Sequence, residues 1–235
     1  MTYTILARSA ETGEIGIGIA TYSLAVGSLC PAIRAGAGVV SSQAFVNPEL
    51  HRRGLDHLVQ GRSATETLGA LMTVDPQIDF RQLLLLDSQG RGAGFTGART
   101  RPWAGHRLGA GYVIGGNVLA NEGVVDAMAK AFAGATGRTL DDRLLRALEA
   151  GRDAGGQAGS AGHLPERSAA LIVVGPGPDD RLDLRVDLHG DAVTQLRAIC
   201  AEYAPYRAFH RVRHLDPANA LPQERFVAEL AKRAS

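Results

Sequence analysis

The sequence predicts an α+β fold in which helices cover two stacked, mainly antiparallel sheets. Three observations predict it. Strand-like and helix-like segments come in groups, so that strands outnumber the crossovers that a parallel, doubly wound sheet would use. Short glycine-containing turns join neighbouring strands, which indicates hairpins and therefore antiparallel pairing. The helices come in pairs between the groups of strands, as expected for layers that cover sheets.

The N-terminal part is predicted to form three strands. Residues Thr2–Arg8 mix β-branched, aromatic and apolar side chains, which strands favour. After the turn SAETGE, the run Ile15–Ser23 alternates isoleucine with glycine and small residues, so that one side allows close backbone approach. Residues Gly36–Phe45 are predicted to form the third strand.

Two helices are expected next. Pro48 suits the first turn of a helix, and leucines follow it at helical spacing as far as Gly61. Ser63 is placed to cap the second helix, with Glu66 at the capping-box position.

The same grouping continues along the chain. Residues 82–97 predict a hairpin around DSQGR, and residues 111–117 predict one more strand. Helical patterns start at Asn121 and after Thr139, which is predicted to cap its helix. A flexible, glycine-rich loop is expected over 153–165.

The last elements are a strand pair and helices. SAALIVVG and LDLRVDL are expected to pair around PGPDD, and a helix is expected over Asp191–Tyr203. Residues 204–235 differ in composition, with many arginines and three prolines, and PQERFVAELAKRA predicts a helix. We therefore expect one domain over 1–203 and a C-terminal extension over 204–235.

Composition and charge narrow the classes of partner. Lys and Arg total 25 against 24 Asp and Glu, and this balance gives no reason to expect a nucleic acid or an anionic membrane as partner. No apolar run approaches the roughly 20 residues that span a bilayer, and the N-terminus lacks a secretory pattern. The two cysteines, Cys30 and Cys200, lack C-x-x-C spacing. We expect a cytoplasmic protein.

Motifs for cofactors and metals are missing from the sequence. No phosphate-binding loop, dinucleotide fingerprint or Gly-x-Ser-x-Gly elbow occurs. The seven histidines are scattered, and His210 and His214, one helical turn apart, lie in the arginine-rich tail. We expect neither a cofactor nor a metal ion.

A candidate nucleophile stands directly behind the initiator methionine. Loss of Met1 would leave Thr2 with a hydroxyl and a free α-amine, a nucleophile with its own base. Small polar residues close the predicted strands: Thr21, Ser23, Ser41, Ser42, Gln43 and Asn117. Each alone is more often a turn former or cap. As a group beside Thr2 they indicate a small polar pocket.

Several stretches, in this order, carry a resemblance to a known family: ETGEIGIGIA, RAGAGVVSSQAFVNP, DSQGRGAGFTG and WAGHRLGAGYVIGGNVLA. Over about residues 2–200 the chain resembles the family catalogued as domain of unknown function 1028. Members of that family look like N-terminal-nucleophile (Ntn) hydrolases. The resemblance implies a four-layer α-β-β-α sandwich, and an enzyme whose first residue after processing attacks an amide.

Carried over by position, the resemblance makes Thr2 the nucleophile and Asn117 an oxyanion donor, with Ser23 as a further catalytic candidate. The lysine of proteasome-like relatives has no counterpart here, and Arg34, the nearest basic residue, cannot act as a base. Arg34 is instead expected to hold a substrate carboxylate. The expected substrate-binding residues are Thr21, Arg34, Ser42, Gln43, Asn47 and His106.

The leading hypothesis is therefore a hydrolase of a non-peptide C–N bond in a small polar substrate. We also expect a homo-oligomer. Two alternatives stay open. One is a non-catalytic ligand-binding or assembly protein with the same sandwich, and the other is a hydrolase with an internal nucleophile such as Ser23 or Cys30.

Overall fold

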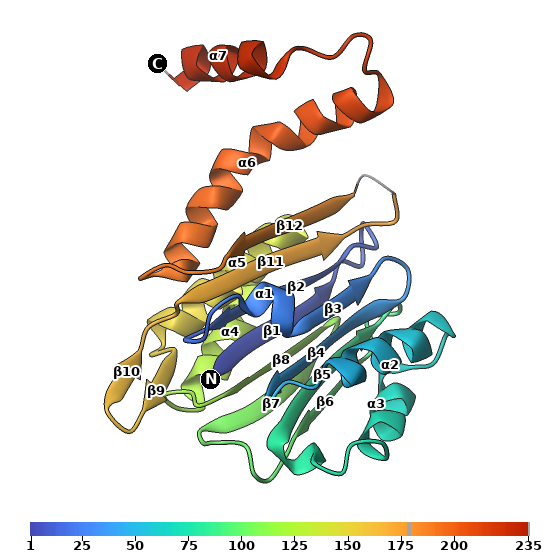
Figure 1. Cartoon of the computed structure of the whole chain (residues 1–235), viewed down its shortest axis with the longest axis vertical. Coiled ribbons are helices and arrows are strands. Elements are labelled where there is room, and N and C mark those ends of the chain that lie inside the picture. The colour runs from blue at the N-terminus through green and yellow to red at the C-terminus, as the bar shows by residue number, and fades with distance from the viewer. Residues whose placement is uncertain (178–179, 235) are drawn as a thin grey trace. The chain divides into compact units, whose positions relative to one another are not determined.

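The structure is a computed structural model that describes residues 1–177 and 180–234 (Figure 1). Its contacts divide the chain into two units, Met1–Leu196 and the part from Arg197 onward. Residues 178–179 of the turn predicted around PGPDD, and residue 235 of the predicted extension, lie outside the described part.

The first unit contains two antiparallel sheets (Figure 1). The larger sheet has the strand order β12-β11-β2-β1-β8-β7. Its strands are β1 Thr2–Arg8, β2 Ile15–Thr21, β7 Ala104–Gly109, β8 Tyr112–Asn117, β11 Ser168–Val174 and β12 Arg181–Val186. The smaller sheet, in the order β3-β4-β5-β6, consists of β3 Pro31–Arg34, β4 Gly38–Ala44, β5 Arg81–Asp87 and β6 Gly92–Thr96.

Helices cover the outer faces of both sheets. Helices α2 (Pro48–Val59) and α3 (Ala64–Met72) pack on the smaller sheet. Helices α4 (Gly123–Gly134) and α5 (Leu140–Asp153) pack on the larger one. Because the two sheets also contact each other, the layer order is helix, sheet, sheet, helix, which confirms the predicted α+β sandwich.

The run LLLL in β5 shows how the layers divide the core. Leu84 and Leu86 belong to the cluster between the sheets, together with Leu6 and Ile17. Leu83 and Leu85 point the other way, into the cluster under α2 and α3. Neighbouring side chains of a strand face opposite sides, so a strand covered on both faces is apolar throughout.

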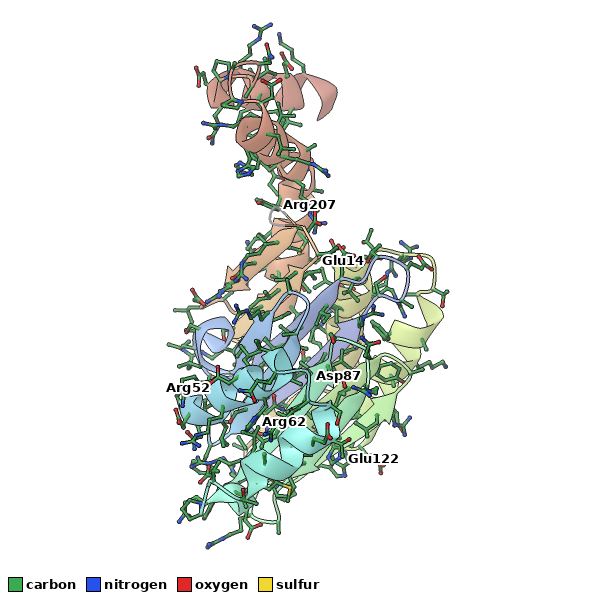
Figure 2. The ribbon with its side chains drawn as sticks, turned by 90° about the vertical axis from the view of Figure 1, so that its right-hand side faces the viewer. Glu14, Arg52, Arg62, Asp87, Glu122 and Arg207 are labelled. Carbon is green, nitrogen blue, oxygen red and sulfur yellow. The ribbon has the colours of Figure 1, made fainter. Side chains whose placement is uncertain are left out.

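Turn and cap chemistry at the ends of β5 and α3 agrees with the sequence. The carboxylate of Asp87, which is labelled in Figure 2, accepts from Arg91 Nε at 2.8 Å and from the backbone N–H of Ala64 at 3.2 Å. These two bonds hold the DSQGR turn against α3. Ser63 and Glu66 form the predicted capping box. Thr139 lies at the N-cap of α5, but its side chain makes no capping hydrogen bond.

Several short elements are absent from the prediction. They are the four-residue strand β3, the edge strand β7, the short helix α1 (Val26–Leu29), the 3-10 turn Ile78–Phe80, and the small hairpin of β9 (Gln157–Gly159) and β10 (Gly162–Leu164). The hairpin falls in the segment expected to be a flexible loop. Elements of three to six residues offer too few side chains to show a period of their own.

The second unit is helical. Helix α6 (Ala192–Leu215) runs past the predicted end at Tyr203 and through Pro205, and α7 (Gln223–Ala234) follows. Pro205 removes one backbone donor, but aromatic residues beyond it pack against α7. The ring of Phe209 stacks on Phe226 with centroids 4.0 Å apart. This packing continues the helix where composition alone indicated a boundary.

Among the described residues, no helix has the length and apolar character needed to cross a membrane.

Candidate functional site

Three strand ends meet beside the start of β1. The register pairs Thr2 with Thr21 of β2 on one side and with Asn117 of β8 on the other. Thr21 in turn pairs with Ser168 of β11. The antiparallel sheet thus brings together three predicted site residues that lie far apart in the sequence.

The Thr2 hydroxyl is buried at this end of the sheet. Thr2 is only 5% exposed, and its Oγ1 donates to the carbonyl oxygen of Met1 at 2.6 Å. Thr21 Oγ1 lies 3.3 Å from Thr2 Oγ1 and also donates to the Met1 carbonyl. The candidate nucleophile, the Thr2 hydroxyl, and the Thr21 hydroxyl therefore both donate to the carbonyl oxygen of Met1.

The α-amine of Met1 lies in the same place. It donates to Asn117 Oδ1 at 2.6 Å. Its pKa is lowered from 8.0 to about 6, chiefly by burial; Cys30 acts in the opposite direction, and Arg101 adds a smaller lowering. An amine with such a pKa is mostly neutral at pH 7, so it can accept a proton.

Asn117 is oriented by a buried neighbour. Its Nδ2 donates to Gln82 Oε1 at 3.0 Å, while its Oδ1 faces the amine. An oxyanion donor must instead direct an N–H group at the substrate, so this role stays a prediction. The sequence analysis missed Gln82. The available signal was a polar side chain at the start of an otherwise apolar strand, since a buried amide needs partners.

The structure places the other catalytic candidates less favourably. Ser23 lies at the surface beyond the end of β2, where its carbonyl accepts from Ser168 Oγ at 2.8 Å. Cys30 is buried, and burial raises its thiol pKa to about 12. Because the thiolate is the reactive form, such a thiol is a poor nucleophile at neutral pH.

Two expected substrate-binding residues hold α2 in place. Asn47 caps the helix by accepting from Glu49 N at 3.1 Å, and its side chain donates to Asp75 at 2.9 Å. Ser42 is fully buried, and its N–H donates to His51 Nε2 at 3.0 Å. Burial lowers the pKa of His51, which is consistent with this acceptor role.

The remaining expected residues are spread over both sheets. Gln43 is fully buried between the sheets, where Thr4 Oγ1 donates to it at 2.7 Å. His106 is exposed on β7, and its Nδ1 lies 2.9 Å from Thr96 Oγ1. Arg34 pairs with Gly38, at the opposite end of β4 from Gln43. At about 3.3 Å per residue, Gly38 is roughly 16 Å from Gln43 along β4, so Arg34 lies far from the other expected residues of the smaller sheet.

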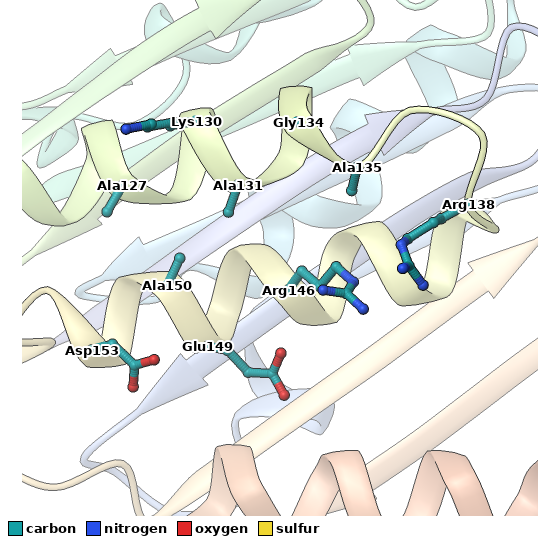
Figure 3. Close-up of a pocket in the computed structure, with 10 residues that line it drawn as sticks. All are labelled: Ala127, Lys130, Ala131, Gly134, Ala135, Arg138, Arg146, Glu149, Ala150 and Asp153. Atoms are coloured by element: carbon teal, nitrogen blue, oxygen red, sulfur yellow. The ribbon is translucent and has the colours of Figure 1, made fainter.

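A separate groove lies between α4 and α5 (Figure 3). It has a volume of about 690 Å³, with alanines and Gly134 along its floor and charged side chains such as Lys130 and Glu149 at its rim. None of the predicted site residues lines it. The cluster around Thr2 and the groove are therefore different places on the first unit.

Comparison with known proteins identifies the family. The model of a family of unknown function, DUF1028, matches residues 2–196. The crystal structure of a DUF1028 protein from Silicibacter pomeroyi is 32% identical, with a TM-score of 0.78, and the match covers 86% of each chain. Anbu, an ancestral beta-subunit from Yersinia bercovieri, matches at 14% identity and a TM-score of 0.38 over 89% of this chain and 97% of its own. No curated protein matches. The chain belongs to the DUF1028 family.

Proposed function

We propose that this member of the DUF1028 family is an Ntn-type hydrolase. It cleaves an amide C–N bond in a small polar substrate, with Thr2, exposed by removal of Met1, as the nucleophile. The observation that carries the proposal is the position of Thr2. Its hydroxyl is buried at the start of β1, between Thr21 and Asn117, at the place where the chain's amino end lies.

The proposed reaction has two steps. Thr2 Oγ attacks the substrate carbonyl carbon while the α-amine takes the hydroxyl proton, directly or through a water molecule. The tetrahedral intermediate collapses, the C–N bond breaks, and the leaving nitrogen receives that proton. Water then attacks the acyl ester, which releases the acid and restores the Thr2 hydroxyl.

Thr21 supports this proposal through its hydrogen bond. In the chain that retains Met1, the Thr21 hydroxyl donates to a carbonyl oxygen beside Thr2 Oγ1. A donor in this position is suited to hold a substrate carbonyl in the same way. We therefore assign Thr21 to substrate binding.

The test begins with the mass of the untagged protein, which is expected to correspond to a chain that starts at Thr2. Thr2→Ala keeps the amine and removes the hydroxyl, so it is expected to fold and to be inactive against a panel of amides. Thr2→Ser keeps both groups and is expected to retain part of the activity. A tag before Thr2 that is not removed converts the amine to an amide, and it should abolish activity as fully as Thr2→Ala.

Each alternative has its own signature in this experiment. Full activity with a blocked amine refutes the proposed mechanism, and loss only at Ser23 or Cys30 favours an internal nucleophile. No turnover in any form favours a ligand-binding or assembly protein. A homo-oligomer and a cytoplasmic location stay predictions, to be checked by light scattering and by cell fractionation.

A further inference from the structure

A chain of buried side-chain amides leads from the core between the sheets to the start of β1. Gln43 on β4, Gln82 on β5 and Asn117 on β8 are fully buried. Gln82 lies in the middle. Its Oε1 accepts from Gln43 Nε2 at 2.7 Å and from Asn117 Nδ2 at 3.0 Å.

Backbone carbonyls fix the orientation of the Gln82 amide. Its Nε2 donates to the carbonyl oxygen of Gly105 at 3.0 Å and to that of Gly116 at 2.9 Å. A carbonyl oxygen can only accept, so the nitrogen must face these two groups and Oε1 must face away from them. The reverse orientation would place the Gln82 oxygen against these two carbonyl oxygens, with no hydrogen bond between them.

This orientation is passed on to Asn117. Because Gln82 Oε1 can only accept, Asn117 must direct its Nδ2 toward Gln82. The Oδ1 atom of Asn117 then faces the start of β1, where in the chain that retains Met1 it accepts from the α-amine of Met1 at 2.6 Å. Reversing the Asn117 carboxamide would place a nitrogen against the amine and an oxygen against Gln82 Oε1, so both bonds would be lost.

We propose that Gln82 is a positioning residue. It holds the Asn117 carboxamide with its oxygen toward the α-amine, so that Asn117 Oδ1 accepts a hydrogen bond from this amine and thereby orients it. The inference rests on the proposed function in one respect: the amine that acts as base is that of Thr2, which becomes the amino end beside Asn117 once Met1 is removed. It assigns Asn117 to the amine rather than to the oxyanion.

The titratable and charged groups known to act on the amine are Cys30 and Arg101. Both stay unchanged in the variants below. A changed amine pKa is therefore attributable to the amide chain.

The experiment measures the pKa of the α-amine without any turnover. The protein is treated with cyanate over a range of pH, and carbamylation of the N-terminal peptide is followed by mass spectrometry, once with Met1 retained and once without it. Since no enzymatic activity is measured, failure of the hydrolase proposal leaves the outcome interpretable.

Gln82→Met removes the group that orients Asn117, and Gln43→Met is the matched control. Both remove a fully buried glutamine amide, but the control leaves the bond between Gln82 and Asn117 in place. Because an oriented acceptor favours the protonated amine, Gln82→Met is expected to raise the acid dissociation constant of the amine about threefold or more. Gln43→Met is expected to leave it unchanged. Equal effects of the two variants would overturn the proposal.

Asn117→Asp puts a negative charge at the position of the acceptor. An opposite charge this close typically favours the protonated amine strongly, so the neutral fraction near pH 7, and with it the carbamylation rate, is expected to fall about tenfold. An unchanged rate would show that Asn117 does not contact the amine.

A measurement on the unaltered protein covers the case in which Gln82→Met fails to fold. The side-chain amide hydrogens of Gln43 and Asn117 both point at Gln82 Oε1, so a nuclear Overhauser effect is expected between them. A reversed Asn117 carboxamide would give none, and that result would also overturn the proposal.

Discussion

The amine beside Asn117 makes the stability of the chain that retains Met1 depend on pH. Burial lowers the pKa of this amine from 8.0 to about 6 in the folded chain, whereas the unfolded chain keeps the ordinary value. Between these two values the unfolded chain binds a proton that the folded chain does not bind. The free energy of unfolding therefore rises with pH across this window, and this stability is lost as the pH falls through about 6.

The size of the effect follows from the shift. Each pKa unit corresponds to about 1.4 kcal/mol, so the difference between 8.0 and about 6 sets an upper limit of roughly 2.7 kcal/mol. Met1 is partly exposed, and solvent screening reduces this contribution. We expect a rise of about 1–2 kcal/mol.

The assay is urea denaturation of the Met1-bearing protein, expressed while methionine aminopeptidase is inhibited. The same protein acetylated at its amino terminus is the control, because the acetylated nitrogen does not titrate. Burial also lowers the pKa of His51 and His106 from 6.5, so their contribution lies below about pH 6.5, and the comparison uses the upper part of the amine's window, between about pH 6.5 and 8. An equal pH dependence in the acetylated control would refute the buried neutral amine.

Three further substitutions separate the assigned roles. Asn47→Ala removes the cap of α2 and is expected to lower the free energy of unfolding by about 1 kcal/mol without changing KM, as measured by denaturation and kinetics; a raised KM would return Asn47 to substrate binding. Cys30→Ala is expected to keep kcat, because the thiol is protonated at neutral pH, and loss of kcat in the folded variant would favour an internal nucleophile. Asn117→Ala removes the acceptor that orients the α-amine, so kcat is expected to fall about tenfold with little change in substrate binding, and an unchanged kcat in the folded variant would reassign Asn117 to turn formation. A loss of about 100-fold would return Asn117 to the role of an oxyanion donor.

The layers were predictable because they follow from periodicity. The alternation of Ile15–Thr21, the run LLLL and the paired amphipathic helices each predict which faces of a strand or helix are buried. This prediction needs only the local sequence, not the position of distant segments. The proximity of Thr2 to Thr21 and Asn117 was also foreseeable. Thr2 begins its strand and the other two residues end theirs, and antiparallel pairing brings the start of one strand beside the ends of its neighbours.

The rest of the site depends on contacts that local sequence does not encode. Gln82 acquires its orientation from the carbonyls of Gly105 and Gly116, which no pattern around residue 82 reveals. The sequence Asn47-Pro48 fits a helix N-cap as well as a substrate-binding residue. The hydrogen bond that Asn47 Oδ1 accepts from Glu49 N favours the role of N-cap. Arg34 was expected near the site as the nearest basic residue in place of the missing lysine. The short strand β3 was not predicted, so nothing in the sequence indicated that Arg34 would pair with Gly38, at the far end of β4.

The place of β1 inside its sheet has a consequence for protein synthesis. β1 and β2 are neighbours in the sequence and can pair as soon as Thr21 has left the ribosome, but the other neighbour of β1, β8, ends only at Asn117. At typical elongation rates this delay is on the order of 10 s, during which one edge of β1 has no partner. Arrival of β8 brings Asn117 against the amino end. The proposed removal of Met1 is therefore expected to be easiest while the chain is still growing, and slower elongation before residue 117 is expected to increase it.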